Sequence, residues 1–265
     1  METPQQLPGR NVLVTGGSQG IGLELARRYL QDGARVLVTG RSASRLAVAA
    51  RELPGLETVV SDAGRASDRE RLVDHVLDVL PDVDVVVNNA GIQRRVALAD
   101  DHDPWSVREE ELHVLLSGPV HLNHLLVPHL VRRGTPAQVV NVTSGGAFVP
   151  QPFAPLYSAL KAALHSYTLT LRHALAGTAV RVTELAPPAV ATGLSGLDAP
   201  HGAPVEVFAD AAYAGLTAAR EFVGHGATAA PELLARVRAE QDMFDALASR
   251  FAVSTYLDTS GQDRG

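Results

Sequence analysis

The stretch Asn11–Leu30, NVLVTGGSQGIGLELARRYL, decides the fold of this chain. A short apolar run leads into a glycine cluster and then into apolar residues at helical spacing, which predicts a strand, a tight turn and a helix that begins at about Gly20. Glycines let the turn approach a pyrophosphate closely, and the first helical turn points unpaired N–H groups and a positive dipole end at that anion. The G-x-x-x-G-x-G spacing therefore indicates the opening of a dinucleotide-binding βαβ unit.

Strand and helix patterns alternate along the rest of the chain. Further strands are predicted at 35–39, 58–60, 83–87, 138–142, 180–185 and 221–223, and helices at 43–52, 67–80, 103–131, 154–175, 205–219 and 231–249. In the longest helix, Asp103 is the expected N-cap and Pro104 the first helical residue. The alternation predicts an α/β Rossmann fold in a single domain of residues 1–265. Its seven-stranded sheet is doubly wound and mostly parallel, with helices on both faces.

Composition excludes several functional classes. The net charge of −6 argues against a nucleic-acid-binding surface, and the absence of cysteine excludes disulfides and thiolate metal sites. The N-terminal segment METPQQLPGR lacks the apolar region of a signal peptide, and no uninterrupted apolar stretch reaches the roughly 18 residues of a membrane span. We therefore expect a cytoplasmic protein that binds neither membranes nor nucleic acid.

Polar residues with chemical potential follow the predicted strands. Asn88–Gly91 (NNAG) comes after the fourth strand and Ser144 after the fifth. Tyr157 and Lys161 stand four residues apart on the next helix, so they project from one face. Because the carboxyl ends of parallel strands share one edge of a sheet, these groups are expected to meet the glycine turn in one crevice.

Together these motifs resemble the classical branch of the short-chain dehydrogenase/reductase family over about residues 9–193. The resemblance rests on TGGSQGIG (Thr15–Gly22), NNAG, Ser144, Y-x-x-x-K (Tyr157–Lys161) and PPAVAT (Pro187–Thr192). The stretches NNAGIQ and PLYSALKAALHSYTLTLRHAL are most similar to bacterial DltE-like oxidoreductases. The resemblance implies an enzyme that interconverts a carbonyl and a secondary alcohol with a nicotinamide cofactor.

The resemblance also implies roles for individual residues. Tyr157 would be the acid/base, Ser144 would hydrogen-bond the substrate oxygen, and Lys161 would favour the phenolate and hold the nicotinamide ribose. The residues expected to bind the cofactor are Gly16, Gly17, Ser18, Gln19, Gly20, Ile21, Gly22, Arg41, Asp62, Asn88, Ala90, Gly91, Tyr157, Lys161, Pro187, Val190 and Thr192. No metal is expected.

The residues that end the second strand favour NADP(H) over NAD(H). NAD-dependent members carry an acidic residue there for the ribose 2′-hydroxyl, whereas this chain has Gly40 followed by Arg41. An arginine suits a 2′-phosphate because it forms bidentate, charge-assisted hydrogen bonds. Arg45 could assist, or it could be a solvated helix residue.

One position departs from the family pattern. The family places a catalytic asparagine in an N-x-x-G motif, and in this chain Leu115 stands three residues before Gly118. Leucine cannot hold the water of the family's proton relay, Asn123 lies about two turns away, and Glu111 is one turn back on the same face. Two alternatives stay open: an enzyme of this fold with atypical or non-redox chemistry, and a non-catalytic NADP(H) sensor.

The expected substrate pocket is mainly apolar. It would be lined by Ile92, Gln93, Gly145, Ala147, Phe148, Pro188 and the loop and helix of residues 193–219, which include Leu194, Leu197, Val205 and Phe208. Since no cluster of bases is apparent there, we expect a neutral, fairly hydrophobic small molecule. The histidines of the two longest helices, including His165, are expected to be exposed or at a subunit contact, and the resemblance implies a homodimer or homotetramer.

Overall fold

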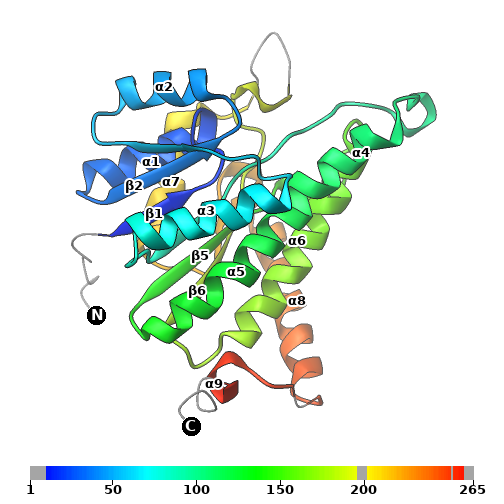
Figure 1. The fold of residues 1–265 in the computed structure, drawn as a ribbon. Helices are drawn as coiled ribbons and strands as arrows, with labels where there is room; N and C mark the ends of the chain where they lie inside the picture. The colour runs from blue at the N-terminus through cyan, green and yellow to red at the C-terminus, as the bar shows by residue number, and fades with distance from the viewer. Residues whose placement is uncertain (1–9, 196–201, 252, 260–265) are drawn as a thin grey trace.

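In the computed structural model, which describes residues 10–195, 202–251 and 253–259, seven parallel strands form one sheet in the order β3-β2-β1-β4-β5-β6-β7. The strands are β1 (Asn11–Val14), β2 (Arg35–Gly40), β3 (Glu57–Val60), β4 (Val85–Asn88), β5 (Ala137–Val142), β6 (Val180–Ala186) and β7 (Phe222–Gly224). Every predicted strand is present, and helices cover both faces (Figure 1). The predicted Rossmann fold is confirmed.

The central strands are buried along their whole length. Every residue of β4 and β5 is buried, as expected of valine-rich strands covered by helices on both faces. Strand β1 pairs with β2 on one side and with β4 on the other, so the strand order reverses there. In doubly wound sheets a ligand crevice opens at such a reversal, beyond the carboxyl ends of the strands.

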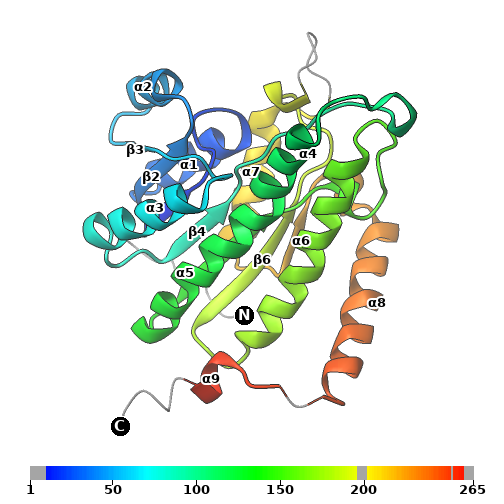
Figure 2. The same cartoon turned by 45° about the vertical axis from the view of Figure 1, so that its right-hand side comes forward.

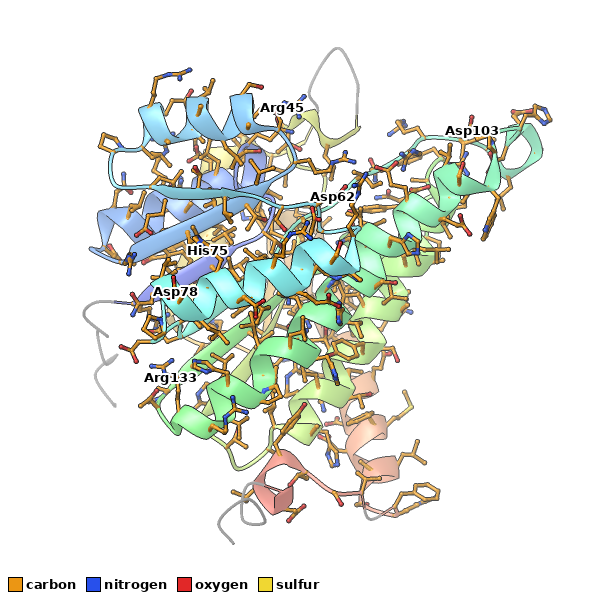
Figure 3. The ribbon with its side chains drawn as sticks, viewed as in Figure 1. Arg45, Asp62, His75, Asp78, Asp103 and Arg133 are labelled. Carbon is orange, nitrogen blue, oxygen red and sulfur yellow. The ribbon has the colours of Figure 1, made fainter. Side chains whose placement is uncertain are left out.

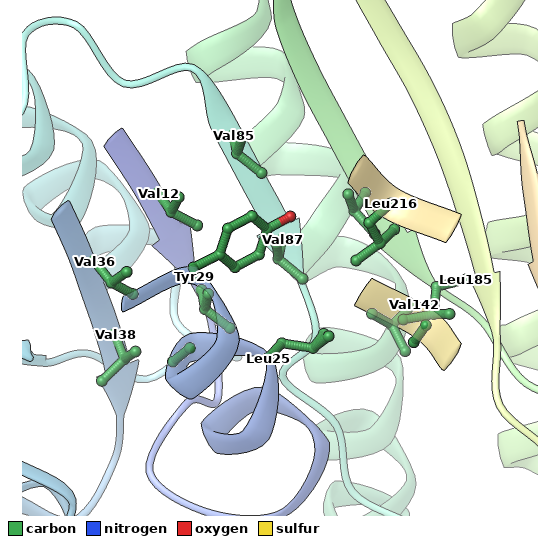
Figure 4. Close-up of a cluster of buried hydrophobic side chains, with 14 of the residues drawn as sticks. Val12, Leu25, Tyr29, Val36, Val38, Val85, Val87, Val142, Leu185 and Leu216 are labelled. Carbon is green, nitrogen blue, oxygen red and sulfur yellow. The ribbon is translucent and has the colours of Figure 1, made fainter. Parts of the chain in front are cut away.

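Two layers of helices enclose the sheet. The helices are α1 (Gly20–Gln31), α2 (Ala43–Glu52), α3 (Ala66–Val79), α4 (Trp105–Leu112), α5 (Gly118–Arg133), α6 (Pro155–Ala174), α7 (Val205–Thr217), α8 (Pro231–Ala248) and α9 (Tyr256–Thr259). Side chains of α1, α2 and α7 pack on one face, and side chains of α3, α5 and α6 pack on the other. On the first face Tyr29 of α1 lies among Val12, Val36 and Val85 (Figure 4).

The long helix predicted over 103–131 is interrupted. Helix α4 passes into a π-helical turn, His113–Ser117, before α5 begins at Gly118. The predicted N-cap is wrong: Pro104 occupies the cap, and the Asp103 carboxylate instead accepts a 2.8 Å hydrogen bond from Arg108. A π-helical turn inserts a residue into the helix and often marks a functional position. Here it carries Leu115.

Helix α4, the π-helical turn and α5 follow one another without a gap. Together, as Trp105–Arg133, they are long and apolar enough to cross a membrane by length and composition alone. Half of the most apolar window of this stretch is buried inside this fold, as in the core helix of a soluble protein.

Helix α8 is attached to the outside of the α6 layer (Figure 2). None of its residues, all of which the structure describes, is buried. Polar contacts hold it: Arg236 donates to the carbonyl of Phe148 at 2.7 Å, and Arg172 of α6 donates to Gln241 at 2.8 Å.

Candidate active site

A cleft of about 720 Å³ opens at the carboxyl ends of the strands. It is lined by the glycine turn after β1, the segments that follow β2 to β6, and the first turns of α6. Arg45 and Asp62, which both line it, lie toward the same end of the molecule, and Arg133 lies toward the opposite end (Figure 3). The cleft is therefore where the strand order predicts a ligand site.

The glycine turn forms a close-fitting wall of this cleft. Gly16 has φ +67°, and a Cβ built there would meet the Ala90 Cα at 2.8 Å, so only glycine fits. Gly20, with φ +58°, begins α1, and the preceding Gln19 provides no side-chain cap. The first N–H groups of α1 are thus available to an anion in the cleft.

The predicted catalytic side chains meet in the same cleft. Ser144 follows β5, and Tyr157 and Lys161 lie in the first two turns of α6, on one face. All three line the cleft and are buried, with exposed fractions of 7%, 6% and 4% respectively. The Lys161 Nζ atom lies 5.8 Å from the centre of the Tyr157 ring.

Burial shifts the acid–base properties of this pair. Burial raises the pKa of Tyr157, and a hydrogen bond with Ser144 opposes that rise only in part. Burial also lowers the pKa of Lys161 from 10.5 to about 8. At neutral pH the arrangement therefore holds a protonated phenol beside a largely charged amine.

Most of the residues predicted to bind a cofactor line the cleft. They are Gly16, Ser18, Gln19, Gly20, Ile21, Arg41, Asp62, Ala90, Gly91, Tyr157, Lys161, Pro187, Val190 and Thr192. Gly17 and Gly22 instead serve packing: a Cβ at Gly17 would lie 2.6 Å from the Val38 side chain, and one at Gly22 would lie 2.5 Å from the carbonyl oxygen of Gly16.

Asn88 is also placed differently from the prediction. Its Nδ2 atom donates to Asn123 at 2.8 Å and to Asn141 at 2.9 Å, and the whole cluster is buried beneath the cleft. The next residue takes the expected position instead, because Asn89 donates to the carbonyls of Thr15 and Gly16 at 2.9 and 3.0 Å. Asn88 thus ties the sheet to α5.

Leu115 is fully buried and packs in a cluster with Ala154, Tyr157 and Leu160. It also borders a small cavity of about 20 Å³, enough for one water, whose lining includes Lys161 and Asn88. The buried Oδ1 atom of Asn88 has no hydrogen-bond partner among the residues that the structure describes. Asn123 donates to Asn141 in the amide cluster at 3.3 Å, and one oxygen of Glu111 accepts from Arg108 at 3.2 Å. Among the described residues that border this cavity, neither Asn123 nor Glu111 is found.

The predicted substrate pocket needs correction. Ile92, Gln93, Pro188 and Leu194 line the cleft, whereas Phe208 is fully buried under α1 and the Phe148 ring packs 4.8 Å from His165. Leu197 lies outside the described residues.

The sequence-based pocket also missed four residues that line the cleft, Arg94, Arg95, Gln151 and Phe153. The expectation that the lining holds no cluster of bases is therefore not met, because Arg94 and Arg95 both line the cleft. The signal was available, because Arg94 and Arg95 directly follow the NNAGIQ motif.

A carboxylate of α4 links two of the cleft arginines. Glu110 accepts a 2.6 Å hydrogen bond from Arg41 on one oxygen and a hydrogen bond from Arg94 on the other. The pair of contacts joins the end of β2 to the segment after β4.

His165 is buried, which corrects the expectation that it is exposed. Its Nδ1 atom lies 2.7 Å from Glu184 of β6, and its Nε2 atom lies 3.2 Å from Glu240 of α8. Burial acts to lower the pKa of His165, but the hydrogen bond and charge of Glu184, with Glu240, outweigh it and raise the pKa. The other oxygen of Glu184 accepts from Thr143, next to Ser144, at 2.7 Å.

The fold and the cleft define a Rossmann-type dinucleotide-binding enzyme. Residues 10–200 match the short chain dehydrogenase family. The chain is 46% identical over 190 residues to the Bacillus subtilis (strain 168) protein named uncharacterized oxidoreductase DltE, covering 72% of this chain and 75% of that protein. The chain therefore belongs to the short-chain dehydrogenase family and is a DltE-like oxidoreductase of that family.

Solved structures share its fold. A short-chain dehydrogenase from Sphingobium yanoikuyae in complex with NADPH has a TM-score of 0.78 at 23% identity, covering 92% of this chain and 96% of that chain. A short chain dehydrogenase/reductase from Burkholderia phymatum in complex with NAD has a TM-score of 0.78 at 20% identity, covering 91% and 96%.

Proposed function

We propose that this protein is an NADP(H)-dependent oxidoreductase that interconverts a carbonyl and a secondary alcohol on a small molecule. The observation that carries the proposal is that Ser144, Tyr157 and Lys161 line the same cleft as the glycine turn. In this proposal one cleft contains both a proton donor and the binding site for a dinucleotide.

The cleft fits a dinucleotide on features of the chain itself. The positive φ angles of Gly16 and Gly20 shape a tight turn at the cleft, and the uncapped start of α1 offers N–H groups to a pyrophosphate. At the far end, Arg41, Ser42 and Arg45 line the cleft beside Gly40, where no acidic residue stands. Two arginines and a hydroxyl suit a 2′-phosphate better than a bare ribose hydroxyl.

In this proposal NADP(H) supplies the hydride, and the chain supplies the proton. The raised pKa of Tyr157 keeps its phenol protonated at neutral pH, which suits donation to a carbonyl oxygen during reduction. Ser144 lies next to the phenol and orients the same oxygen. The Lys161 ammonium favours the phenolate left by proton transfer, because an opposite charge nearby stabilises it. A positioned acid of this kind contributes on the order of 10²–10⁴-fold to the rate.

The lining of the cleft favours a fairly hydrophobic substrate, since Ile92, Pro188 and Leu194 are part of it. Arg94 and Arg95 line the cleft as well, so the proposed substrate is not limited to neutral molecules. We retain as proposals that residues 193–219 form the substrate loop and helix, and that the protein is a cytoplasmic homodimer or homotetramer.

A second candidate, non-redox acid/base chemistry in the same site, is favoured by one observation. Leu115, which replaces the family asparagine, is packed against Tyr157 and places no polar atom beside Lys161. In that case Tyr157 would act as an acid or base on a substrate that is neither oxidised nor reduced.

The test follows NADPH oxidation with a panel of aldehydes, ketones and quinones. Tyr157→Phe is expected to abolish turnover while NADPH binding, measured by fluorescence titration, is retained. Tyr213→Phe is the matched control, because its hydroxyl contacts Asp32 at the far end of α1, and it should turn over normally. NADPH binding without oxidation of NADPH by any panel member would favour the second candidate.

A further inference from the structure

The charge of the cleft is opposite to that of the chain. The protein carries a net charge of −6, yet among the residues that the structure describes the cleft lining contains Arg41, Arg45, Arg94, Arg95 and Lys161 and one carboxylate, Asp62. A concave site with one sign of charge focuses its field on an entering ligand and favours a ligand of opposite charge.

Not all of these cations are available to a substrate. Arg41 and Arg94 share the Glu110 carboxylate, Arg41 and Arg45 lie at the end assigned to the 2′-phosphate, and Lys161 belongs to the catalytic wall. Among the residues that the structure describes, Arg95 forms no ion pair with a carboxylate. Among the described lining residues, Arg95 is therefore the cation that neither the proposed cofactor site nor Glu110 engages.

Arg95 is held over Phe153, in the segment that precedes the helix of the catalytic tyrosine. Its guanidinium carbon lies 3.9 Å from the centre of the Phe153 ring, and the next residue, Val96, donates its N–H to the Phe153 carbonyl at 3.0 Å. A second pair, Gln93 and Gln151, joins the same two segments at 3.1 Å. Arg95, Phe153 and Tyr157 all line the same cleft.

The Arg95 guanidinium lies over the Phe153 ring, a contact that uses the face of the group and not its N–H groups. Those N–H groups can bind a carboxylate or sulfonate with two hydrogen bonds. Phe153 and Leu194 add apolar surface to the lining of the cleft. Together they match a ligand with a short apolar body and one anionic end.

We propose that the substrate is an anionic carbonyl compound, whose carboxylate or sulfonate binds Arg95 while its aldehyde or ketone oxygen faces Tyr157 and Ser144. This inference rests on the proposed oxidoreductase function, and it makes Arg95 a specificity-determining residue. The reaction stays a two-electron reduction: the carbonyl carbon gains hydride from NADPH, its oxygen gains the Tyr157 proton, and the anionic group is unchanged.

The experiment compares oxo acids of four to seven carbons that carry a methyl ketone at the end opposite the carboxylate with their methyl esters, using NADPH and the full chain. We expect kcat/KM for the best acid to exceed that for its ester by about tenfold, the scale of one hydrogen-bonded charge contact. Arg95→Gln should remove this preference by raising KM for the acid far more than KM for the ester. Arg71→Gln, an exposed arginine outside the cleft, is the control for net charge and should keep the preference.

A binding measurement separates this inference from the proposed function. The corresponding secondary hydroxy acids and their amides, which NADPH cannot reduce, are titrated calorimetrically into the NADPH-loaded wild type and Arg95→Gln. Arg95-dependent binding of the acids without turnover of any carbonyl compound would support the anionic site and refute the redox function. Equal kcat/KM for acids and esters, or a preference that survives in Arg95→Gln, would overturn the anionic site. Acids that bind equally well to both proteins would overturn it too.

Discussion

The ammonium group of Lys161 donates a 2.6 Å hydrogen bond to the backbone carbonyl of Val142, two residues before Ser144. The contact ties the lysine of α6 to the end of β5, so the two elements that carry the catalytic side chains are joined by one of those side chains. The ammonium is buried, and burial lowers the pKa of Lys161 to about 8. Keeping the buried Lys161 side chain charged therefore lowers the free energy of unfolding.

We expect Lys161→Met to inactivate the enzyme and to stabilise it at pH 7. The pKa of Lys161 falls from 10.5 to about 8, a difference that corresponds to about 3 kcal/mol. Loss of the hydrogen bond to Val142 destabilises the variant by about 1 kcal/mol and offsets part of this gain. Urea denaturation at pH 7 should therefore show a variant more stable by about 2 kcal/mol.

The lowered pKa of Lys161 also predicts how the stability difference between Lys161→Met and wild type changes with pH. Between pH 8 and 10.5 the unfolded chain holds the lysine proton and the folded chain does not, so wild-type stability rises with pH in that window. The advantage of Lys161→Met should shrink across the same window. A variant less stable than wild type at pH 7 would show that the hydrogen bond outweighs the cost of burial.

At position 115 we compare two substitutions. Leu115→Ala should lower the free energy of unfolding by about 2–5 kcal/mol, because a fully buried leucine leaves a cavity beside Tyr157. Leu115→Asn should lower it less, because an amide there faces the cavity that Asn88 also lines, where the Asn88 Oδ1 atom lacks a donor. Chemical denaturation of both variants measures the difference. Greater destabilisation by asparagine than by alanine would contradict the expectation.

The sequence predicted the elements that local pattern controls. The glycine turn was placed correctly because positive-φ glycines and a strand–helix switch leave a local signature, and Ser144, Tyr157 and Lys161 were brought together because parallel strands end at one edge. The orientation of Asn88 was missed for a local reason. The fourth strand was predicted to end at 87, but β4 includes Asn88, so strand alternation turns its side chain away from the cleft.

Contacts between distant segments could not be predicted. Glu110 meets Arg41 across 69 positions of sequence, and no pattern within either helix or strand specifies that approach. The burial of His165 left one signal that could have been used: Glu184 stands inside the apolar strand VRVTELA, and a buried carboxylate requires a partner. The π-helical turn was not predictable from periodicity, since its residues continue the helical pattern.

We expect the link between Glu110 and Arg41 to weaken binding of NADPH. Arg41 donates to the Glu110 carboxylate at 2.6 Å, so a 2′-phosphate must compete with that carboxylate for the guanidinium. Glu110→Gln should tighten NADPH binding by about 3–10-fold, and Arg41→Gln should weaken it by about tenfold. NADH, which has no 2′-phosphate, serves as the control ligand in both fluorescence titrations and should change little. Weaker NADPH binding by Glu110→Gln would instead mean that the carboxylate orients Arg41 for the phosphate.

The buried pair of His165 and Glu184 should stabilise the fold in acid and not in base. Glu184 of β6 and Glu240 of α8 face the imidazole, and Lys161 lies one turn away on α6. The carboxylates outweigh burial and raise the pKa of His165 above 6.5. The contribution of the pair is therefore fully present below pH 6.5 and is lost as pH rises through the raised value.

We expect Glu184→Gln to lower stability by at least about 2 kcal/mol at pH 6, since it leaves a buried imidazolium without its counter-charge. The loss should be clearly smaller at pH 9, where the imidazole is neutral in both proteins. Glu240→Gln is the matched control: its carboxylate is partly exposed, so it should cost no more than about 1 kcal/mol. The comparison uses variant minus wild type at each pH, so that the titration of Lys161 cancels. An equal loss at pH 6 and pH 9 would mean that Glu184 acts through its hydrogen bond to Thr143 alone, without a charged His165.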